Sequence, residues 1–410
     1  MTVDTRARPA YTWTPRVTVQ LMVLAAAAFV YVTAEMVPVG ALPAIAADLR
    51  VSEALVGTLL ASYALVAALT TVPLVRLTAL WTRRTTLVVT LVCLTVSQLI
   101  SALAPDFAVL AGGRVLCALT HGLMWSVIAP IGARLVPATH SGRATTAVYV
   151  GTALALVIGN PLTAAMSELW GWRLAVVLVT VAAAAVTALA WAALPPMVMP
   201  RDGTQTVRRG GHRRNRRLFT LTALTLIGVT GHFISYTFIV AIIRDVVGVH
   251  GARLAWLLVA FGIAGLVSMG VMARPLDRWP QASVVGCLAA LATAFAALTS
   301  LAFDRGTGVV ALMIGGGAIV LWGAASTALP PMLQATAMRT APDDPDGASG
   351  LYVAGFQVGI MAGSLAGGLI YQHAGLALMI GASTALVMVA LTCVTATRGL
   401  FEVTQATDRK

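Results

Sequence analysis

The stretch PPMVMPRDGTQTVRRGGHRRNRRLF, residues 195–219, is the one long polar interruption in an otherwise apolar chain. It holds seven arginines, whereas 59% of the 410 residues are hydrophobic and only 10% are charged. A soluble globular domain carries roughly 25% charged residues, so most of this chain is not suited to contact with water. The stretch therefore predicts a solvated linker between two apolar halves.

Apolar runs long enough to cross a bilayer recur on both sides of this linker. A helix needs about 20 residues to cross a ~30 Å hydrocarbon core, and it satisfies its own backbone groups in lipid. The alternation expected of membrane-barrel strands is missing. We therefore predict an all-α polytopic membrane protein with twelve transmembrane helices, six in each half. The expected helices cover residues 17–46, 53–76, 85–104, 107–132, 143–166, 173–194, 218–242, 253–273, 281–302, 307–331, 347–371 and 375–397.

A basic turn follows the second helix of each half, VRLTALWTRRTTL at 75–87 and ARPLDRWP at 273–280. This recurrence suggests an internal duplication, and transporters built from such repeats bind substrate near the midplane between the repeats. The span map gives an N-terminal arm at 1–16, a six-helix half at 17–194, the linker at 195–217, a second six-helix half at 218–397 and a tail at 398–410.

The net charge of +12 reports topology and lipid contact, not nucleic-acid binding. Most of the 27 Lys and Arg fall on the side of the linker and both termini. Cytoplasmic loops are enriched in Lys and Arg, so both termini are expected in the cytoplasm, with the basic loops near anionic headgroups. A single lysine, Lys410, against 26 arginines, together with abundant Ala and Val, fits a bacterial genome of high GC content, so we expect a multi-pass protein of a bacterial inner membrane. Five arginines are expected on the opposite side: Arg50, Arg173, Arg244, Arg253 and Arg305.

Metal and disulfide chemistry are not expected. The four cysteines lie singly in separate expected helices, where free thiols behave as small apolar residues. No histidine–carboxylate cluster with metal spacing and no nucleophile motif occurs. We therefore expect no metal, no cofactor and no soluble catalytic domain.

Glu35 is the one acid among fifteen that lies well inside an expected helix. It stands in VTAEMVPVGALP, residues 32–43, past the midplane of the first helix. Exposure of such a group to lipid costs at least ~2.5 kcal/mol, so it faces a partner or a water-filled cavity. Two interpretations are open: a structural hydrogen bond to another helix, or a proton carrier, because burial disfavours the charged form of a carboxyl. We favour the proton carrier.

Arg114, in AGGRVLCALTHGLMW, is the one basic residue inside an expected helix. A guanidinium does not deprotonate in proteins, so Arg114 needs a permanent partner, as a structural clasp or as part of coupling. His121 follows at two helical turns and Trp125 one turn further, on nearly the same face. These rings could line a cavity for a polar or ring-shaped substrate, or form a structural hydrogen bond with a packing Trp.

The seventh expected helix carries GHFISYTFIVAIIRD, which places His232 and Tyr236 on one face with Thr237 beside them. Cavity lining and hydrogen bonding to backbone carbonyls both fit this cluster. Gln357, in GFQVGIMAGSLAGG, is a further polar group in the eleventh helix, among glycines that suit tight packing.

The fifth expected helix reads YVGTALALVIGNPLTAAMSELWGWR. Gly151, Gly159 and Pro161 lack bulk or break the hydrogen-bond ladder, which allows close helix approach and a bend. Asn160 adds a polar group at the expected bend, where it could contact a substrate.

These motifs resemble the major facilitator superfamily, and within it the drug:proton antiporters of the sugar-efflux, arabinose-efflux-like branch. The fourth helix is similar to R-x-x-x-A-x-x-H through Arg114, Ala118 and His121. GTALALVIGNPL with the following GWR resembles the antiporter motif of the fifth helix, and HFISYTFI resembles the pattern of the seventh. The first helix matches T-x-E-F-x-x-x-G-L-L-P at Thr33, Glu35, Gly40, Leu42 and Pro43, with Met36 at the Phe position.

The resemblance also implies a gate in the loop between the second and third helices. Arg83 and Arg84 match the motif G-x-L-x-D-R-x-G-R-[RK], whereas Ala79 stands at its Asp position. The charge clasp ascribed to that Asp must then be absent or replaced, and Asp277 and Arg278 in the second half are the expected replacement.

The resemblance implies proton-driven export of a small sugar or drug-like molecule, with Glu35 as proton and substrate site, Thr33 beside it, and Arg114 coupled to it. We expect a monomer that uses the proton gradient. The seventh helix has Val240 and Ala241 where the sugar-efflux pattern continues with E-P, which weakens any specific sugar assignment. The alternatives are an importer or facilitator and, from another class, a polytopic membrane enzyme or sensor.

Overall fold

The computed structural model describes residues 14–51, 53–197, 215–250, 252–304, 308–397 and 399–401 of the chain. Within these ranges all regular structure is helical. Most of the expected arm, linker and tail lies outside the described residues, as does the side chain of Asn160. The prediction of an all-α chain is confirmed for the described part.

The helices of the first half follow the expected spans, with two interruptions. The first span breaks at Ala41, and the fifth contains a π-helical turn over Ala155–Gly159. The helices are α1 (Pro15–Gly40), α2 (Leu42–Leu49), α3 (Glu53–Leu77), α4 (Arg83–Ala102), α5 (Phe107–Arg134), α6 (Ser141–Leu154), α7 (Asn160–Trp170) and α8 (Trp172–Ala193).

The helices of the second half are longer on average, and the last of them is two spans joined at a kink. Gly375, with φ 81°, adopts a backbone conformation that residues with a Cβ rarely take, and the chain turns there. The helices are α9 (Arg216–Tyr236), α10 (Ile239–Asp245), α11 (Ala252–Arg278), α12 (Pro280–Asp304), α13 (Val309–Thr340) and α14 (Pro345–Ala396).

Ten of the described helices are long and apolar enough to cross a membrane. The expected second span corresponds to α3, whose apolar part is Ser62–Leu77, and α14 supplies two spans on either side of Gly375. The predicted twelve-helix membrane fold is therefore confirmed.

Short polar segments start several helices by capping them. The side chains of Asp106, Asn215 and Asp344 each accept a hydrogen bond from the backbone N–H three residues later, at 2.9, 3.1 and 2.9 Å. Such N-caps satisfy donors that have no partner within the helix. The starts of α5, α9 and α14 are thus local consequences of the sequence.

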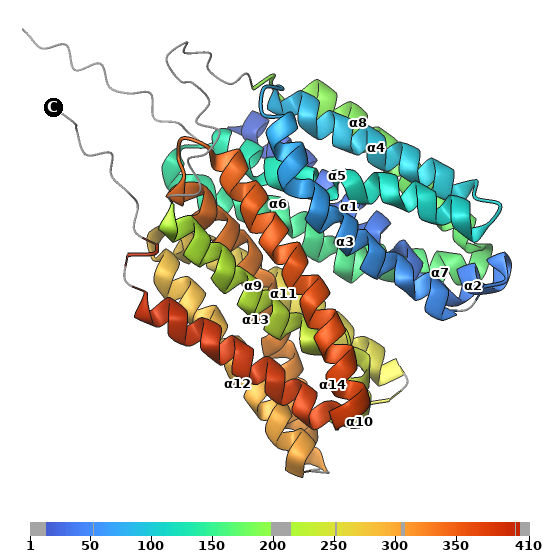
Figure 1. Cartoon of the computed structure of the whole chain (residues 1–410), viewed down its shortest axis with the longest axis vertical. Coiled ribbons are helices and arrows are strands. Elements are labelled where there is room, and N and C mark those ends of the chain that lie inside the picture. Colours follow the sequence, from blue (N-terminus) through green and yellow to red (C-terminus); the bar gives the residue numbers. More distant parts are fainter. Residues whose placement is uncertain are drawn as a thin grey trace, which may run out of the picture.

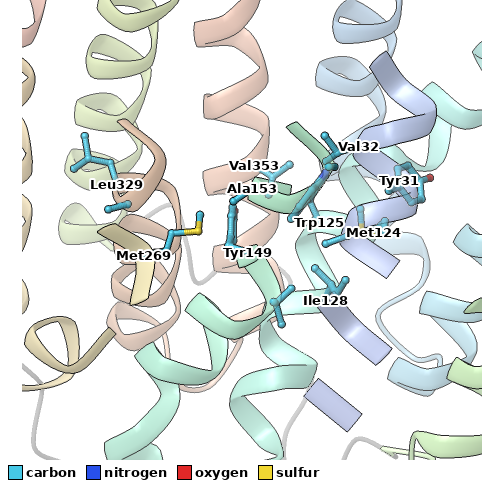
Figure 2. Packing of buried hydrophobic residues seen from close by; sticks show 14 of the residues in the cluster. Tyr31, Val32, Met124, Trp125, Ile128, Tyr149, Ala153, Met269, Leu329 and Val353 are labelled. Atoms are coloured by element: carbon cyan, nitrogen blue, oxygen red, sulfur yellow. The ribbon is translucent and has the colours of Figure 1, made fainter. Parts of the chain in front are cut away.

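The two halves lie side by side, with α14 running along α3 and α11 along α6 (Figure 1). We call the end of the bundle that carries Met197 and Asn215 the linker end and the opposite end the far end. One hydrophobic cluster runs through both halves. Figure 2 shows its centre, where Tyr149 lies between Trp125 of its own half and Met269 of the other. The ring centroids of Trp125 and Tyr149 are 5.2 Å apart.

The fifth span packs tightly against α1 because two of its residues lack side chains. A Cβ on Gly151 would lie 1.8 Å from the carbonyl oxygen of Ala25, and one on Gly159 would lie 2.2 Å from Oγ1 of Thr33. These distances leave no room for a methyl group. The glycines therefore set how closely the fifth span approaches the helix that carries Glu35.

Candidate functional site

Glu35 lies in α1 with its side chain 13% exposed, so the residue is mostly but not completely buried. Its Oε2 is 4.0 Å from Nδ1 of His121 on α5. His121 is itself buried. The structure thus brings the acid and the imidazole together across two helices that are adjacent in space.

Arg114 is buried on α5. Its guanidinium donates hydrogen bonds to the backbone of α1 rather than to the carboxylate of Glu35. Its Nη1 donates to the carbonyl oxygen of Ala34 at 2.9 Å, and its Nη2 donates to the carbonyl oxygen of Glu35 at 2.8 Å. The Ala34 carbonyl would normally accept from the backbone N–H four residues later, but that residue is Pro38, which has none. Arg114 therefore satisfies a carbonyl that Pro38 leaves free, the permanent partner that a membrane guanidinium requires.

Two tyrosines that the sequence did not single out complete this cluster. The hydroxyl of Tyr63 lies 2.8 Å from Nδ1 of His121 and 3.2 Å from Sγ of Cys117. The guanidinium carbon of Arg114 lies 5.2 Å from the centre of the Tyr63 ring. Tyr31 packs edge-on against His121 and bonds through its hydroxyl to Thr120 at 2.9 Å. Tyrosines within apolar spans were the available signal, but only the fold shows which of them meet His121.

Trp125 and Thr33 are more deeply buried than we expect of side chains that line an open cavity. Both are buried. The backbone carbonyl of Trp125 accepts a hydrogen bond at 2.9 Å from Gln334 of the other half. Oγ1 of Thr33 has no hydrogen-bond partner among the described residues and lies against Gly159. Pro161 is the second residue of α7, just after the π-helical turn, at the expected place of the bend.

The second half contains a separate aromatic cluster. Nε1 of Trp322 on α13 donates to Nδ1 of His232 on α9 at 3.0 Å. The ring of Tyr236 stacks on His232 with centroids 5.0 Å apart. Thr237 bonds to Ser364 at 3.0 Å. Trp322 is fully buried and was not expected from the sequence. Gln357, on α14, is buried as well.

Polar contacts between the halves gather at the linker end, where Asp346 forms the first of two clasps. Its Oδ2 lies 2.8 Å from Nη2 of Arg83 and 2.7 Å from Nη2 of Arg134. Nη1 of Arg134 donates to Oδ1 at 3.1 Å. The acid missing at Ala79 in the loop between α3 and α4 is thus supplied by the first turn of α14, a position that the sequence reasoning did not consider.

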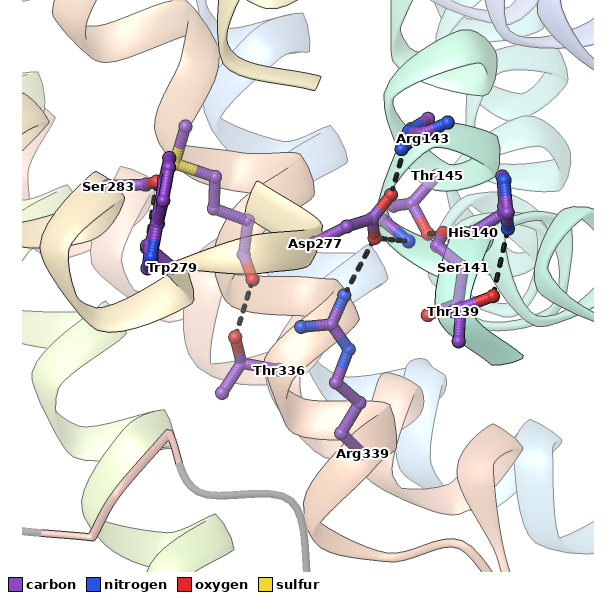
Figure 3. A network of polar contacts seen from close by, with 12 residues as sticks. Thr139, His140, Ser141, Arg143, Thr145, Asp277, Trp279, Ser283, Thr336 and Arg339 are labelled. Atoms are coloured by element: carbon purple, nitrogen blue, oxygen red, sulfur yellow. Dashed lines mark hydrogen bonds and ion pairs between the residues drawn. The ribbon is translucent and has the colours of Figure 1, made fainter. Parts of the chain in front are cut away.

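Asp277 forms the second clasp, shown in Figure 3. Its Oδ1 accepts from the backbone N–H of Gly142 at 2.8 Å and from Nη2 of Arg339 at 3.2 Å, and its Oδ2 lies 3.2 Å from Nε of Arg143. Gly142 and Arg143 belong to the first half, so this clasp also joins the halves. The expected partner Arg278 is not part of it.

Arg278 and Arg84 each contact described residues of their own half. The guanidinium of Arg278 lies over Trp279, 4.8 Å from the ring centroid. Arg84 donates to the carbonyl of Leu194 at 3.3 Å and lies 4.5 Å from the centre of the Trp191 ring. Arg84 therefore ties the start of α4 to the end of α8.

The family of the chain follows from its comparison with known proteins. A model described as Major Facilitator Superfamily matches residues 24–347. The chain belongs to the major facilitator superfamily. It is 64% identical to a chloramphenicol efflux pump of Mycobacterium tuberculosis, over 98% of this chain and 96% of the relative. It is 30% identical to a probable sugar efflux transporter of Mannheimia succiniciproducens, over 87% of this chain and 88% of the relative.

Solved structures share the fold of this transporter at low sequence identity. A human organic anion transporter has a TM-score of 0.74 at 15% identity and covers 93% of this chain and 100% of its own. A bacterial homologue of the iron transporter ferroportin in its outward-facing state has a TM-score of 0.74 at 13% identity, covering 93% and 99%. These structures establish the architecture only.

Membership in this family confirms the predicted resemblance and makes the chain a membrane transporter, so the alternative of a membrane enzyme is wrong. Both relatives named above are efflux proteins, which agrees with the expectation of export. The roles of individual site residues remain predictions.

Proposed function

We propose that this protein exports a small polar, drug-like molecule in exchange for protons, by alternating access between its two halves. The observation that carries the proposal is the place of Glu35. It is the deep membrane acid, it is partly exposed, and its carboxylate oxygen lies 4.0 Å from a buried imidazole. Because Arg114 directs its hydrogen bonds to backbone carbonyls, the carboxylate is left free to bind and release a proton.

The substrate class follows from the relatives and from the aromatic clusters. The 64% identical relative is a chloramphenicol efflux pump, whereas the sugar efflux relative is only 30% identical. The second half offers His232, Tyr236 and Trp322 rather than a second carboxylate. Aromatic walls with few polar groups are typical of sites for ring-containing small molecules. A chloramphenicol-like compound is therefore the preferred substrate over a sugar.

The proposal includes an orientation. Basic loops favour the cytoplasm, so the linker end faces the cytoplasm of a bacterial cell and the far end faces outward. The Asp346 and Asp277 clasps then close the cytoplasmic side. Alternating access requires that both clasps break when the transporter opens inward. The protein acts as a monomer, needs no cofactor and draws its energy from the proton gradient.

Coupling in this scheme is a reciprocal free energy between two ligands. A proton on Glu35 that weakens substrate binding is, for the same reason, released more readily when substrate binds. Binding of substrate from the cytoplasm therefore expels a proton or prevents its uptake, and the outer solution supplies the proton that displaces the substrate.

The test uses purified protein in proteoliposomes with an imposed pH gradient. We expect gradient-driven chloramphenicol transport by the native chain and its loss in Glu35→Gln, which is close in shape and cannot ionise. Asp48→Asn is the matched control, because Asp48 lies on α2, beyond the far end of the span that carries Glu35, and its side chain is 45% exposed. Full gradient-driven transport by Glu35→Gln would disprove the role of Glu35.

Direction separates export from the importer alternative. Intact cells that express the protein should accumulate less labelled chloramphenicol than cells without it, and collapse of the proton gradient should remove the difference. Higher accumulation in the expressing cells would favour import.

A further inference from the structure

Tyr63 holds a central position that the proposed exchange of protons leaves without a role. The residue is buried, and its hydroxyl lies within hydrogen-bond distance of two atoms of α5. One is Nδ1 of His121 at 2.8 Å, and the other is Sγ of Cys117 at 3.2 Å. Its ring also lies under the guanidinium of Arg114. Tyr63 therefore contacts both the imidazole beside Glu35 and the arginine that holds α1.

The geometry at His121 sets two groups in competition for one atom. Nδ1 lies 2.8 Å from the Tyr63 hydroxyl and 4.0 Å from Oε2 of Glu35. A neutral imidazole nitrogen either donates or accepts one hydrogen bond. When Nδ1 accepts from Tyr63, it has no capacity left for a protonated Glu35.

We propose that Tyr63 is a positioning residue that links the protonation of Glu35 to the packing of α3 against α5. While Glu35 is ionised, Tyr63 donates to Nδ1 of His121. When Glu35 binds a proton, its O–H donates to Nδ1 instead, and the Tyr63 hydroxyl turns to Sγ of Cys117. No covalent bond changes in this exchange, and the added proton stays on Glu35. The inference rests on the proposed function.

The surrounding groups support this assignment. The titratable or charged groups that face His121 are Tyr31 and Glu35 from α1, Tyr63 from α3, and Arg114 and Cys117 from α5. The Tyr31 hydroxyl bonds to Thr120 and also interacts with the Cys117 thiol, away from the imidazole nitrogen. Glu35 and Tyr63 are thus the two groups described at Nδ1.

A movement of the Tyr63 ring would be transmitted to the backbone of α1 by Arg114, which contacts both. The guanidinium lies 5.2 Å from the Tyr63 ring while its two terminal nitrogens donate to carbonyls of α1. A shift of the ring therefore changes the contact that fixes α1 against α5 beside the carbonyl that Pro38 leaves free. This provides a physical route from a single proton to a change in helix packing.

The experiment measures the pH dependence of proton release when chloramphenicol is added to the purified, full-length protein. We expect the midpoint of Tyr63→Phe to lie at higher pH than that of the native chain, by roughly half to one pH unit. Without the competing hydroxyl, Nδ1 is free to accept from protonated Glu35, which favours the protonated state. Tyr149→Phe is the matched control, since it removes the hydroxyl of another buried tyrosine whose ring packs on Trp125 rather than on His121, and its midpoint should not change.

A second variant tests the exchange from the opposite side. Cys117→Ala removes the acceptor to which Tyr63 would turn, so the protonated state loses stability and the midpoint should move to lower pH. Opposite shifts in the two variants distinguish an exchange from simple loss of packing, which would lower the amount of folded protein without moving the midpoint.

Two results would count against these ideas in different ways. Native-like midpoints in both Tyr63→Phe and Cys117→Ala, or an equal shift in Tyr149→Phe, would overturn the role of Tyr63 while leaving proton exchange intact. Absence of substrate-driven proton release in the native protein would overturn the proposed function and the inference with it.

Discussion

The clusters around Glu35 and around His232 are built alike but differ in charge. Each places a buried or half-buried histidine whose Nδ1 meets an aromatic hydrogen-bonding group, the Tyr63 hydroxyl in the first half and the Trp322 indole in the second. The first cluster adds the carboxylate of Glu35 and the guanidinium of Arg114. The second adds only uncharged rings. This difference supports the proposal that the first cluster handles the proton and the second contacts the substrate.

The backbone of α1 explains why the cluster in the first half can hold the buried guanidinium of Arg114. Burying an arginine in a membrane helix is costly unless its donors are satisfied. Pro38 leaves the Ala34 carbonyl without its usual donor, and Arg114 supplies one. The corresponding helix of the second cluster, α9, contains no proline. No proline removes a donor from its interior carbonyls, so none of them is left free in the way that the Ala34 carbonyl is.

The largest expected effect comes from replacing Arg114 in the charged cluster around Glu35. Arg114→Met should remove two charge-assisted hydrogen bonds and leave the Ala34 carbonyl unpaired, a loss of roughly 3 kcal/mol or more. Gradient-driven transport in proteoliposomes should fall by about a hundredfold. Arg114→Lys keeps the charge but loses the fork of donors, and should retain an intermediate rate. Native transport by Arg114→Met would show that this arginine is dispensable.

A smaller effect is expected where the two halves meet. Asp346→Asn should weaken the clasp with Arg83 and Arg134 and shift the transporter toward its inward-open state by roughly 2 kcal/mol, or about thirtyfold in population. Spin labels on the linker-end tips of α3 and α14 should report a longer distance. Asp106→Asn, which alters a far-end helix cap, is the control. An unchanged distance distribution would contradict the gating role of this clasp.

The uncharged cluster should respond more mildly. Trp322→Phe removes one neutral hydrogen bond to His232 while keeping a ring, a change of about 1 kcal/mol. The KM for chloramphenicol should rise by about fivefold, and the number of protons exchanged per substrate should stay the same. A changed number of protons exchanged per substrate would contradict the assignment of proton handling to the Glu35 cluster and substrate contact to the His232 cluster.

The smallest effect concerns Asp48, an exposed acid on α2, beyond the end of the span that carries Glu35. The hydrogen bond from the Arg173 guanidinium, together with one from the Trp172 indole, holds the pKa of the Asp48 carboxyl below its usual value. A lowered pKa stabilises the folded state above the unfolded value of about 3.9 and ceases to do so as pH falls through the lowered pKa. Because this pair is exposed, Asp48→Asn should cost under about 1 kcal/mol at neutral pH.

The measurement is thermal unfolding of the native protein and Asp48→Asn over a pH series. The two melting temperatures should differ slightly at neutral pH and converge on strong acidification. A difference that grows as the pH falls would contradict the assigned direction. Gradient-driven transport should be the same in both proteins, unlike the comparison of the native chain with Glu35→Gln.

The sequence predicted the family-level fold well but the contacts of the site poorly. It indicated Glu35 and Arg114 as the charged residues within the helices, and both lie in one cluster. It did not indicate Tyr63, Trp322 or Asp346. Those residues are ordinary in their local sequence, and each acquires its role from a partner far away in the chain: the Asp346 bond to Arg134 spans 212 positions and the Trp322 bond to His232 spans 90.

The sequence by itself determined the number of helices, the side on which the basic loops gather and the one acid that lies deep in the membrane. Length, hydropathy and charge are local properties, and the bilayer acts on each segment separately. It also determined that Pro38 would leave a carbonyl of α1 unpaired. Only the tertiary structure decided that Arg114 supplies the missing donor and that Tyr63 and Glu35 meet at one nitrogen, because such pairings depend on how the helices pack.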